Sequence, residues 1–175
     1  MSQPPSLRRI VTGHNDQGVA VVASDITIDG ETMDSGIKGR SIWITDRVPA
    51  HDNNNSEDGA TRPIGDPSNF ELVHPKGTNF RFTDLSPGHI IPMHRTSSVD
   101  YNVLVFGELI LITEDGAEKH LSPGDVVVQK GTIHAWKNPS STTWARLVSV
   151  LIPAEPAVVQ GKPLDPAFIP LDSSA

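Results

Sequence analysis

The sequence predicts an all-β fold, either a sandwich or a barrel, organised as one structural domain. The chain has 175 residues, which is enough for one domain with its own core. It contains 14 Gly and 15 Pro, and these residues divide it into short apolar runs. From residue 79 onward the runs recur about every eight to ten residues, as in sandwiches and barrels. No run has the length or the period of a helix.

The N-terminal part is predicted to form strands and one long loop. Residues 7–13 and 18–24 predict two strands joined by a turn at Asn15-Asp16, and residues 39–46 contain an alternating strand. The polar stretch 49–67 predicts an exposed loop, which is either a lid over a pocket or a variable surface loop. We expect residues 1–68 to pack on the barrel, with their strands extending its sheet.

The barrel core is predicted over residues 69–152. Its expected strands cover residues 69–73, 79–85, 90–94, 100–106, 108–113, 119–121, 125–129, 133–136 and 143–152. Residues 103–106 and 126–128 are apolar on both faces, so both faces should be covered. The second layer is either the N-terminal strands or another copy of the chain. Residues 153–175 hold five prolines and predict an extended tail across the surface or over a partner subunit.

Composition excludes several classes of function. The net charge of −7, without a basic cluster, argues against nucleic acid and anionic membrane partners. The lack of cysteine excludes disulfides, Cys-zinc sites and thiol nucleophiles. There is no apolar leader and no membrane-length apolar run, so we expect a cytoplasmic protein. Motifs for acyl-enzyme hydrolysis and for nucleotide binding are absent from the sequence.

Strand alternation directs a set of polar and aromatic side chains to one pocket. Side chains two apart on a strand share a face, and closure into a barrel would bring several strands together. The residues expected to face the pocket are His94, Thr96, Asp100, Asn102, His134 and Trp136. Two imidazoles and one carboxylate form a set that suits Fe(II), Zn, Mn or Ni.

The spacing of these residues resembles the two motifs of the cupin superfamily. The first motif is G-x5-H-x-H-x3–4-E-x6-G, and its positions correspond to Gly88, His94, Thr96, Asp100 and Gly107. The second motif ends G-x2-H-x3-N, and these positions correspond to Gly131, His134 and Asn138. The segment HRTSSVDY is similar to that of a subgroup of small single-domain cupins. The resemblance implies an antiparallel jelly-roll β-barrel.

Two departures from the motif reduce the ligand set that the resemblance implies. Thr96 stands where the motif has its second histidine, and Asp100 stands where it has glutamate. The implied metal ligands are therefore His94, Asp100 and His134, holding one divalent ion that is Zn, Fe, Mn or Ni. In the alternative, a metal-free pocket, the histidines hydrogen-bond Asp100 and position an anionic ligand. Thr96, Asn102 and Trp136 are expected to contact substrate.

The expected function is a metal-dependent enzyme acting on a small organic acid or a polyketide-like intermediate. Lyase, decarboxylase, dehydratase or isomerase chemistry needs only a Lewis acid and a residue that moves a proton, here Asp100. The alternatives are an Fe(II) dioxygenase and a non-catalytic module that binds a small ligand. We also expect a homodimer, in which the N-terminal segments pair with the partner's sheet.

Overall fold

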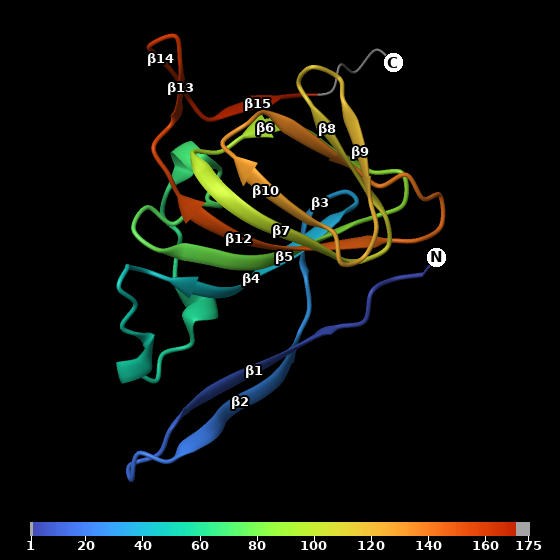
Figure 1. Ribbon diagram of the computed structural model, residues 1–175. Helices are drawn as coiled ribbons and strands as arrows, with labels where there is room; N and C mark the ends of the chain where they lie inside the picture. The colour runs from blue at the N-terminus through green and yellow to red at the C-terminus, as the bar shows by residue number, and fades with distance from the viewer. Residues whose placement is uncertain (1, 171–175) are drawn as a thin grey trace.

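The computed structural model describes residues 2–170 and consists mainly of antiparallel strands in two facing sheets (Figure 1). This confirms the predicted all-β jelly-roll class. The strands are β1 (Leu7–His14), β2 (Ala20–Ile28), β3 (Glu31–Asp34), β4 (Ile37–Thr45), β5 (Thr78–Leu85), β6 (Ile90–Arg95), β7 (Ser98–Phe106), β8 (Leu109–Thr113), β9 (Glu118–Leu121), β10 (Val126–Lys130), β11 (His134–Lys137), β12 (Ala145–Pro153), β13 (Ala157–Val159), β14 (Lys162–Leu164) and β15 (Ala167–Ile169). The helical segments among these residues are short 3-10 turns, η1 (Asp52–Asn54), η2 (Gly59–Thr61) and η3 (Pro67–Asn69). Within the described range no helix is long and apolar enough to cross a membrane.

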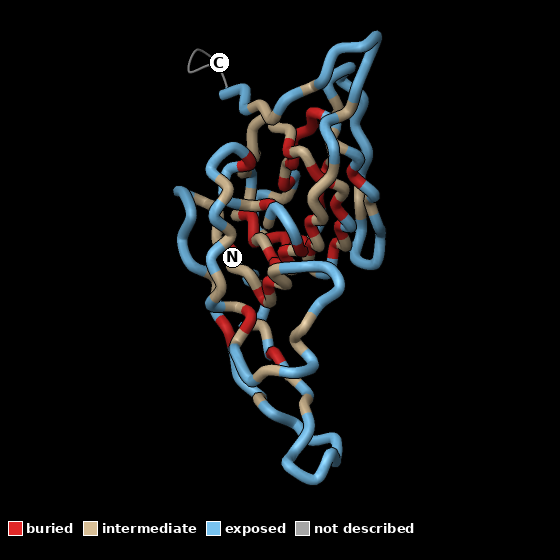
Figure 2. Tube along the Cα trace, turned by 90° about the vertical axis from the view of Figure 1, so that its left-hand side faces the viewer, coloured by how far each residue is buried: buried red, intermediate tan, exposed pale blue. Residues whose placement is uncertain are grey.

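Two sheets enclose the core. One has the strand order β10-β7-β12-β5-β4-β3, and the other has the order β15-β6-β11-β8-β9. Leu85, Leu104 and Leu109 lie between them with no exposed surface, and they pack with Trp136 and Leu147. Figure 2 shows buried residues concentrated in this part of the molecule. Alternate residues of β7 point to this interior, as the period of a strand requires.

Gly107 makes the turn that carries the chain from one sheet to the other. It follows β7 of the six-stranded sheet and precedes β8 of the five-stranded sheet. Its φ of +75° lies in the left-handed region, and a Cβ here would lie 2.2 Å from the carbonyl oxygen of Trp144. Only glycine fits this position without displacing the backbone. The turn places β7 opposite the strands that carry the histidines.

The hairpin of β1 and β2 extends away from the barrel, and its strands pair only with each other (Figure 1). The six-stranded sheet is extended instead by β3 and β4. Apolar residues are exposed on the hairpin, at Ile10 and Val22, and on the outer face of β10, at Val126 and Val128. The N-terminal hairpin of this chain therefore does not cover the outer face of β10, and a layer supplied by a second copy stays a prediction.

The loop of residues 49–67 is held by ion pairs within itself and to β1, and by a hydrogen bond from Arg62 to the carbonyl oxygen of Ile44 on β4. Asp58 pairs with Arg9 of β1, and Asp52 pairs with Arg62 at 2.6 Å. None of the residues 49–67 lines the central cavity. The segment nearest the cavity is the one that follows this loop, at Phe70 and Leu72.

Two predicted segments differ in the structure. Residues 69–73 are not a strand, because Phe70 and Glu71 have φ angles of 56° and 54°, which bend the chain into a turn. The tail is more regular than expected: β13 and β14 form a hairpin, and β15 pairs with β6. The last five residues of the tail, 171–175, lie outside the described residues.

Candidate functional site

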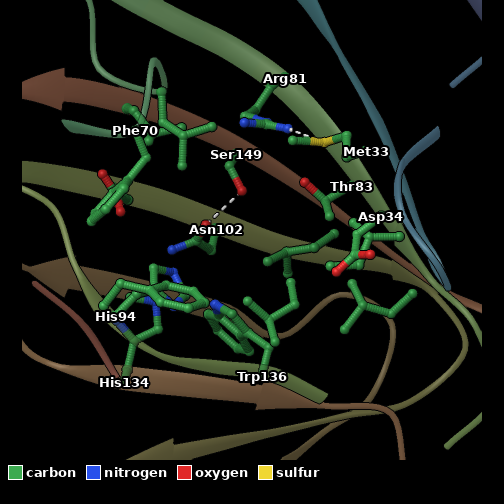
Figure 3. Close-up of a pocket in the computed structure, with 18 residues that line it drawn as sticks. Met33, Asp34, Phe70, Arg81, Thr83, His94, Asn102, His134, Trp136 and Ser149 are labelled. Atoms are coloured by element: carbon green, nitrogen blue, oxygen red, sulfur yellow. Dashed lines mark hydrogen bonds between the residues drawn. The ribbon is translucent and has the colours of Figure 1, made fainter. Parts of the chain in front are cut away.

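A cavity of about 290 Å³ lies between the two sheets (Figure 3). Its walls are mostly apolar and include Met33, Phe70, Ile91, Trp136, Leu147 and Phe168. Its polar and charged lining consists of Asp34, Arg81, Thr83, His94, Asp100, Asn102, His134 and Ser149. An apolar cavity with a few convergent polar groups is the usual form of a small-molecule site.

His94 and His134 form a pair on one wall of the cavity. They are opposite each other in the register of β6 and β11, and their ring centroids are 4.3 Å apart. The Nδ1 atoms lie 2.8 Å from the carbonyl oxygen of Pro92 and 3.1 Å from that of Thr132, respectively. A carbonyl oxygen can only accept, so each Nδ1 carries the proton in the neutral ring. Both Nε2 atoms therefore keep a lone pair.

Burial keeps both imidazoles neutral near pH 7. Burial, together with the neighbouring His94, lowers the pKa of His134 to about 3. Burial also lowers the pKa of His94, although its bond to the Pro92 carbonyl opposes the shift. The Trp136 and His134 rings pack in a T-shaped arrangement, with centroids 5.6 Å apart and an interplanar angle of 83°. Neutral imidazole is the form that accepts a proton or binds a metal ion.

Asp100 lies on the facing sheet and belongs to a short hydrogen-bonded chain. The Ser98 hydroxyl donates to Asp100 Oδ1 at 2.6 Å, and Thr96 Oγ1 lies 2.8 Å from Ser98 Oγ. Burial raises the pKa of Asp100 to about 6, although the bond from Ser98 opposes the shift. Thr96 itself does not line the cavity, because β6 ends at Arg95 and strand alternation stops there. Its hydroxyl reaches the cavity only through Ser98 and Asp100.

Asn102 and Trp136 line the cavity at their expected positions. The Ser149 hydroxyl donates to Asn102 Oδ1 at 2.6 Å, and this leaves the Asn102 amide N–H groups as donors. Trp136 is 4% exposed and also belongs to the core cluster. It is thus a wall residue whose ring is held by packing.

Two of the three predicted metal ligands, His94 and His134, present imidazole nitrogens on one wall of the cavity. Two Nε2 lone pairs on one wall are typical of imidazole ligands whose Nδ1–H is fixed by a carbonyl. Across residues 2–170, however, no three His, Asp or Glu side chains are grouped so that they could hold a metal ion. The three-ligand set of His94, Asp100 and His134 stays a prediction.

Sequence reasoning missed Arg81, Ser149 and Phe168, which also line the cavity. A charged residue between aromatic residues in the β5 sequence TNFRFTDL suggests a solvent-facing position, but β5 is an inner strand. The available signal was the period of two, because Arg81, Thr83 and Leu85 all face the cavity. Phe168 comes from β15, whose pairing with β6 has no local sequence signal.

Residues 81–151, which include both histidines, match the Cupin domain family. The chain is 30% identical to the cupin-domain-containing oxidoreductase fogC of Aspergillus ruber, over 90% of this chain and 77% of that protein. The chain belongs to the cupin family. This cupin is also 34% identical to phomopsin biosynthesis cluster protein C' of Diaporthe leptostromiformis, over 91% of this chain and 87% of that protein.

Among solved structures, the cupin is similar to the polyketide cyclase RemF of Streptomyces resistomycificus. The two share 14% identity with a TM-score of 0.47, over 79% of this chain and 74% of that chain.

Proposed function

We propose that this cupin is an enzyme that moves protons on a small organic acid or polyketide-like intermediate, in a lyase, decarboxylase, dehydratase or isomerase reaction. One observation carries the proposal: two neutral imidazoles present Nε2 lone pairs to an apolar cavity that also contains a carboxyl group with a pKa of about 6. Relatives from fungal biosynthesis clusters are consistent with a small-molecule substrate.

The residues of the cavity suit proton transfer. In the metal-free cavity, Nε2 of His94 would accept a proton from the substrate, because His134, with a pKa of about 3, is the weaker base. The apolar surroundings would favour return of the proton to the product. Asp100, with a pKa of about 6, is able to exchange a proton near neutral pH. The free amide N–H groups of Asn102 would donate to a substrate carbonyl oxygen on which negative charge develops. The apolar walls would exclude competing water.

A divalent ion, Zn, Fe, Mn or Ni, would be held by Nε2 of His94 and His134, and Asp100 would then be the residue that moves a proton. When bound, it would supply a Lewis acid that polarises a carbonyl or carboxylate. As a third ligand, Asp100 would have to be ionised and to present an oxygen that is free of Ser98.

Metal content tests this assignment directly. Untagged wild type, His134→Ala and Asp100→Asn would be compared by mass spectrometric metal analysis. If His134→Ala loses the metal and Asp100→Asn keeps it, the histidine pair binds the ion. If both variants lose the metal, the three-ligand set binds it. Wild-type metal content in His134→Ala would contradict both assignments.

Activity would be tested with aryl-substituted 3-oxo and 3-hydroxy acids. Carbon dioxide release, loss of water and deuterium exchange at the α carbon would be followed by NMR. We expect His94→Gln and His134→Gln to lose turnover, whereas His120→Gln, on the exposed strand β9, should retain it. Wild-type rates in both cavity variants, or no reaction with any member of the panel, would refute the proposal.

Oxygen chemistry at Fe(II) is the second candidate, because four cupin relatives of 30–31% identity are named oxidoreductases. Iron in the purified protein and turnover that requires air would favour it. Turnover of the same rate under anaerobic conditions would favour proton transfer. Ligand binding without turnover in either condition would indicate a non-catalytic module.

We further propose that the cupin is a homodimer, in which the hairpin of β1 and β2 pairs with the partner's sheet. Its support is the exposure of apolar side chains on the hairpin and on the outer face of β10, where Val126 is 61% exposed. A hairpin of two strands is only marginally stable alone in water. Covering both surfaces would remove apolar area from water.

A further inference from the structure

Arg81 is a buried cation at the cavity and has no counter-ion among the residues that the structure describes. Its side chain lies on β5 with 8% of its surface exposed, and it forms part of the cavity wall. Its Nε has no hydrogen-bond partner, and the one hydrogen bond of Nη2 among the described residues is to the Met33 sulfur, at 3.1 Å. Sulfur is a weak acceptor. In residues 2–170 no carboxylate lies within ion-pair distance of this guanidinium.

The other buried arginines of the cupin differ in this respect. Arg146 donates to both oxygens of Asp84, at 2.6 and 2.7 Å, and Arg9 donates to both oxygens of Asp58. Burial of an unpaired charge is unfavourable, and here it lowers the pKa of Arg81 to about 10. An unpaired buried arginine at a cavity is therefore placed for an anion that residues 2–170 do not supply.

Arg81 lies in a row of polar side chains that crosses three strands of the six-stranded sheet. In the strand register Arg81 is opposite Ser149 of β12, and Ser149 is opposite Asn102 of β7. Ser149 uses its hydroxyl hydrogen on Asn102, so the guanidinium at the end of this row keeps free donors. Figure 3 shows the row on one wall and the His94–His134 pair on the facing wall.

Two carboxyl groups also line the cavity, and neither neutralises Arg81. Asp34 is exposed and accepts from the backbone N–H of Ser35. Asp100 accepts from Ser98 and lies on β7, which β12 separates from β5.

We propose that Arg81 binds the carboxylate of the substrate, so that the ligand is an organic acid held between this guanidinium and the histidine pair. This inference rests on the proposed function for the identity of the reacting end, but the binding role of Arg81 is separate from turnover. The planar fork of N–H groups matches the two oxygens of a carboxylate. The apolar walls then accommodate the remainder of the acid.

A matched pair of probes, trans-cinnamate and its neutral amide, tests the role of Arg81. Binding would be measured by calorimetry for wild type, Arg81→Met and Arg40→Met. The methionine at position 81 keeps an apolar stem, and Arg40→Met removes the same charge from β4, outside the cavity. A charge-assisted hydrogen bond is worth about 1.5–3 kcal/mol, which predicts at least a roughly tenfold weaker affinity of Arg81→Met for cinnamate. The amide affinity should stay within about twofold, and Arg40→Met should resemble wild type in both.

Several results would overturn the assignment. They are an unchanged cinnamate affinity in Arg81→Met, an equal loss for acid and amide, or a wild type that binds neither probe at millimolar concentration. Stability gives a second readout, because removal of an unpaired buried charge should leave the urea midpoint at or above that of wild type. A fall as large as that of Arg146→Met would mark Arg81 as structural. If Arg81→Met turns over acids at the wild-type rate, only this inference is refuted. If acid binding depends on Arg81 but no acid is turned over, only the proposed reaction is refuted.

Discussion

The buried His134 should make the cupin unusually sensitive to acid. Its pKa is about 3 in the folded chain and about 6.5 in an unfolded chain, so unfolding takes up a proton over this interval. A histidine whose folded pKa is lowered contributes stability that is complete above about pH 6.5 and is lost as the pH falls toward 3. Between pH 6.5 and pH 4 the loss is about 1.4 kcal/mol per pH unit, or about 3 kcal/mol in total.

The measurement is a comparison of two proteins at two pH values. Urea unfolding of wild type and His134→Gln, both with chelator, would be followed at pH 7 and pH 4. Glutamine does not titrate, so the wild type should lose about 3 kcal/mol more than the variant. Asp100 and His94 are present in both proteins, and their contributions cancel to first order in this difference. Parallel losses in the two proteins would mean that His134 is solvated and that burial does not keep the imidazole pair neutral.

Four other predictions concern Asp100, a buried ion pair, the core and assembly. Asp100 has a raised pKa of about 6, so the stability that it contributes below pH 4 is lost as the pH rises through 6. In urea unfolding, wild type should therefore lose about 3 kcal/mol more than Asp100→Asn between pH 4 and pH 7. Asp84→Asn leaves Arg146 buried and unpaired and should lower the unfolding free energy by about 3–5 kcal/mol, whereas Asp25→Asn, in an exposed pair, should leave the urea midpoint close to wild type. Leu104→Ala, at a site with no exposed surface, should lower the unfolding free energy by about 2–5 kcal/mol, and a smaller loss would show that the core collapses into the space. Light scattering at micromolar concentration should give twice the chain mass of 18.8 kDa, and a monomer mass would refute the dimer.

Local patterns predicted the strands and the histidines because both depend on short-range periodicity. His94 and His134 lie on strands whose alternation is visible in the sequence, and these strands are direct neighbours in the sheet. The segment 69–73 misled the prediction, because its apolar residues resemble a strand while positive φ angles at Phe70 and Glu71 form a turn. Backbone conformation of this kind has no signal in a run of side chains without glycine.

Other parts of the site depend on long-range pairing that the sequence does not display. Arg81 is buried because it faces the cavity between the two sheets from β5, an inner strand whose pairing with β4 and β12 joins segments more than 30 residues apart. Thr96 shares the parity of His94, yet it leaves the cavity because β6 ends one residue earlier. The position of Asp100 relative to the histidines likewise follows from the spacing of two sheets, which residue patterns do not determine.

We expect the short strand β15 to limit the rate at which ligands enter and leave the cavity. It is held to β6 over three residue pairs, and its Phe168 ring meets Phe70 with centroids 6.3 Å apart at the cavity wall. So short an edge strand should open locally at a much lower free energy than the barrel core. We expect bound ligand to slow backbone amide hydrogen exchange at residues 167–169, so that the lifetime of the closed tail would set how long a ligand stays.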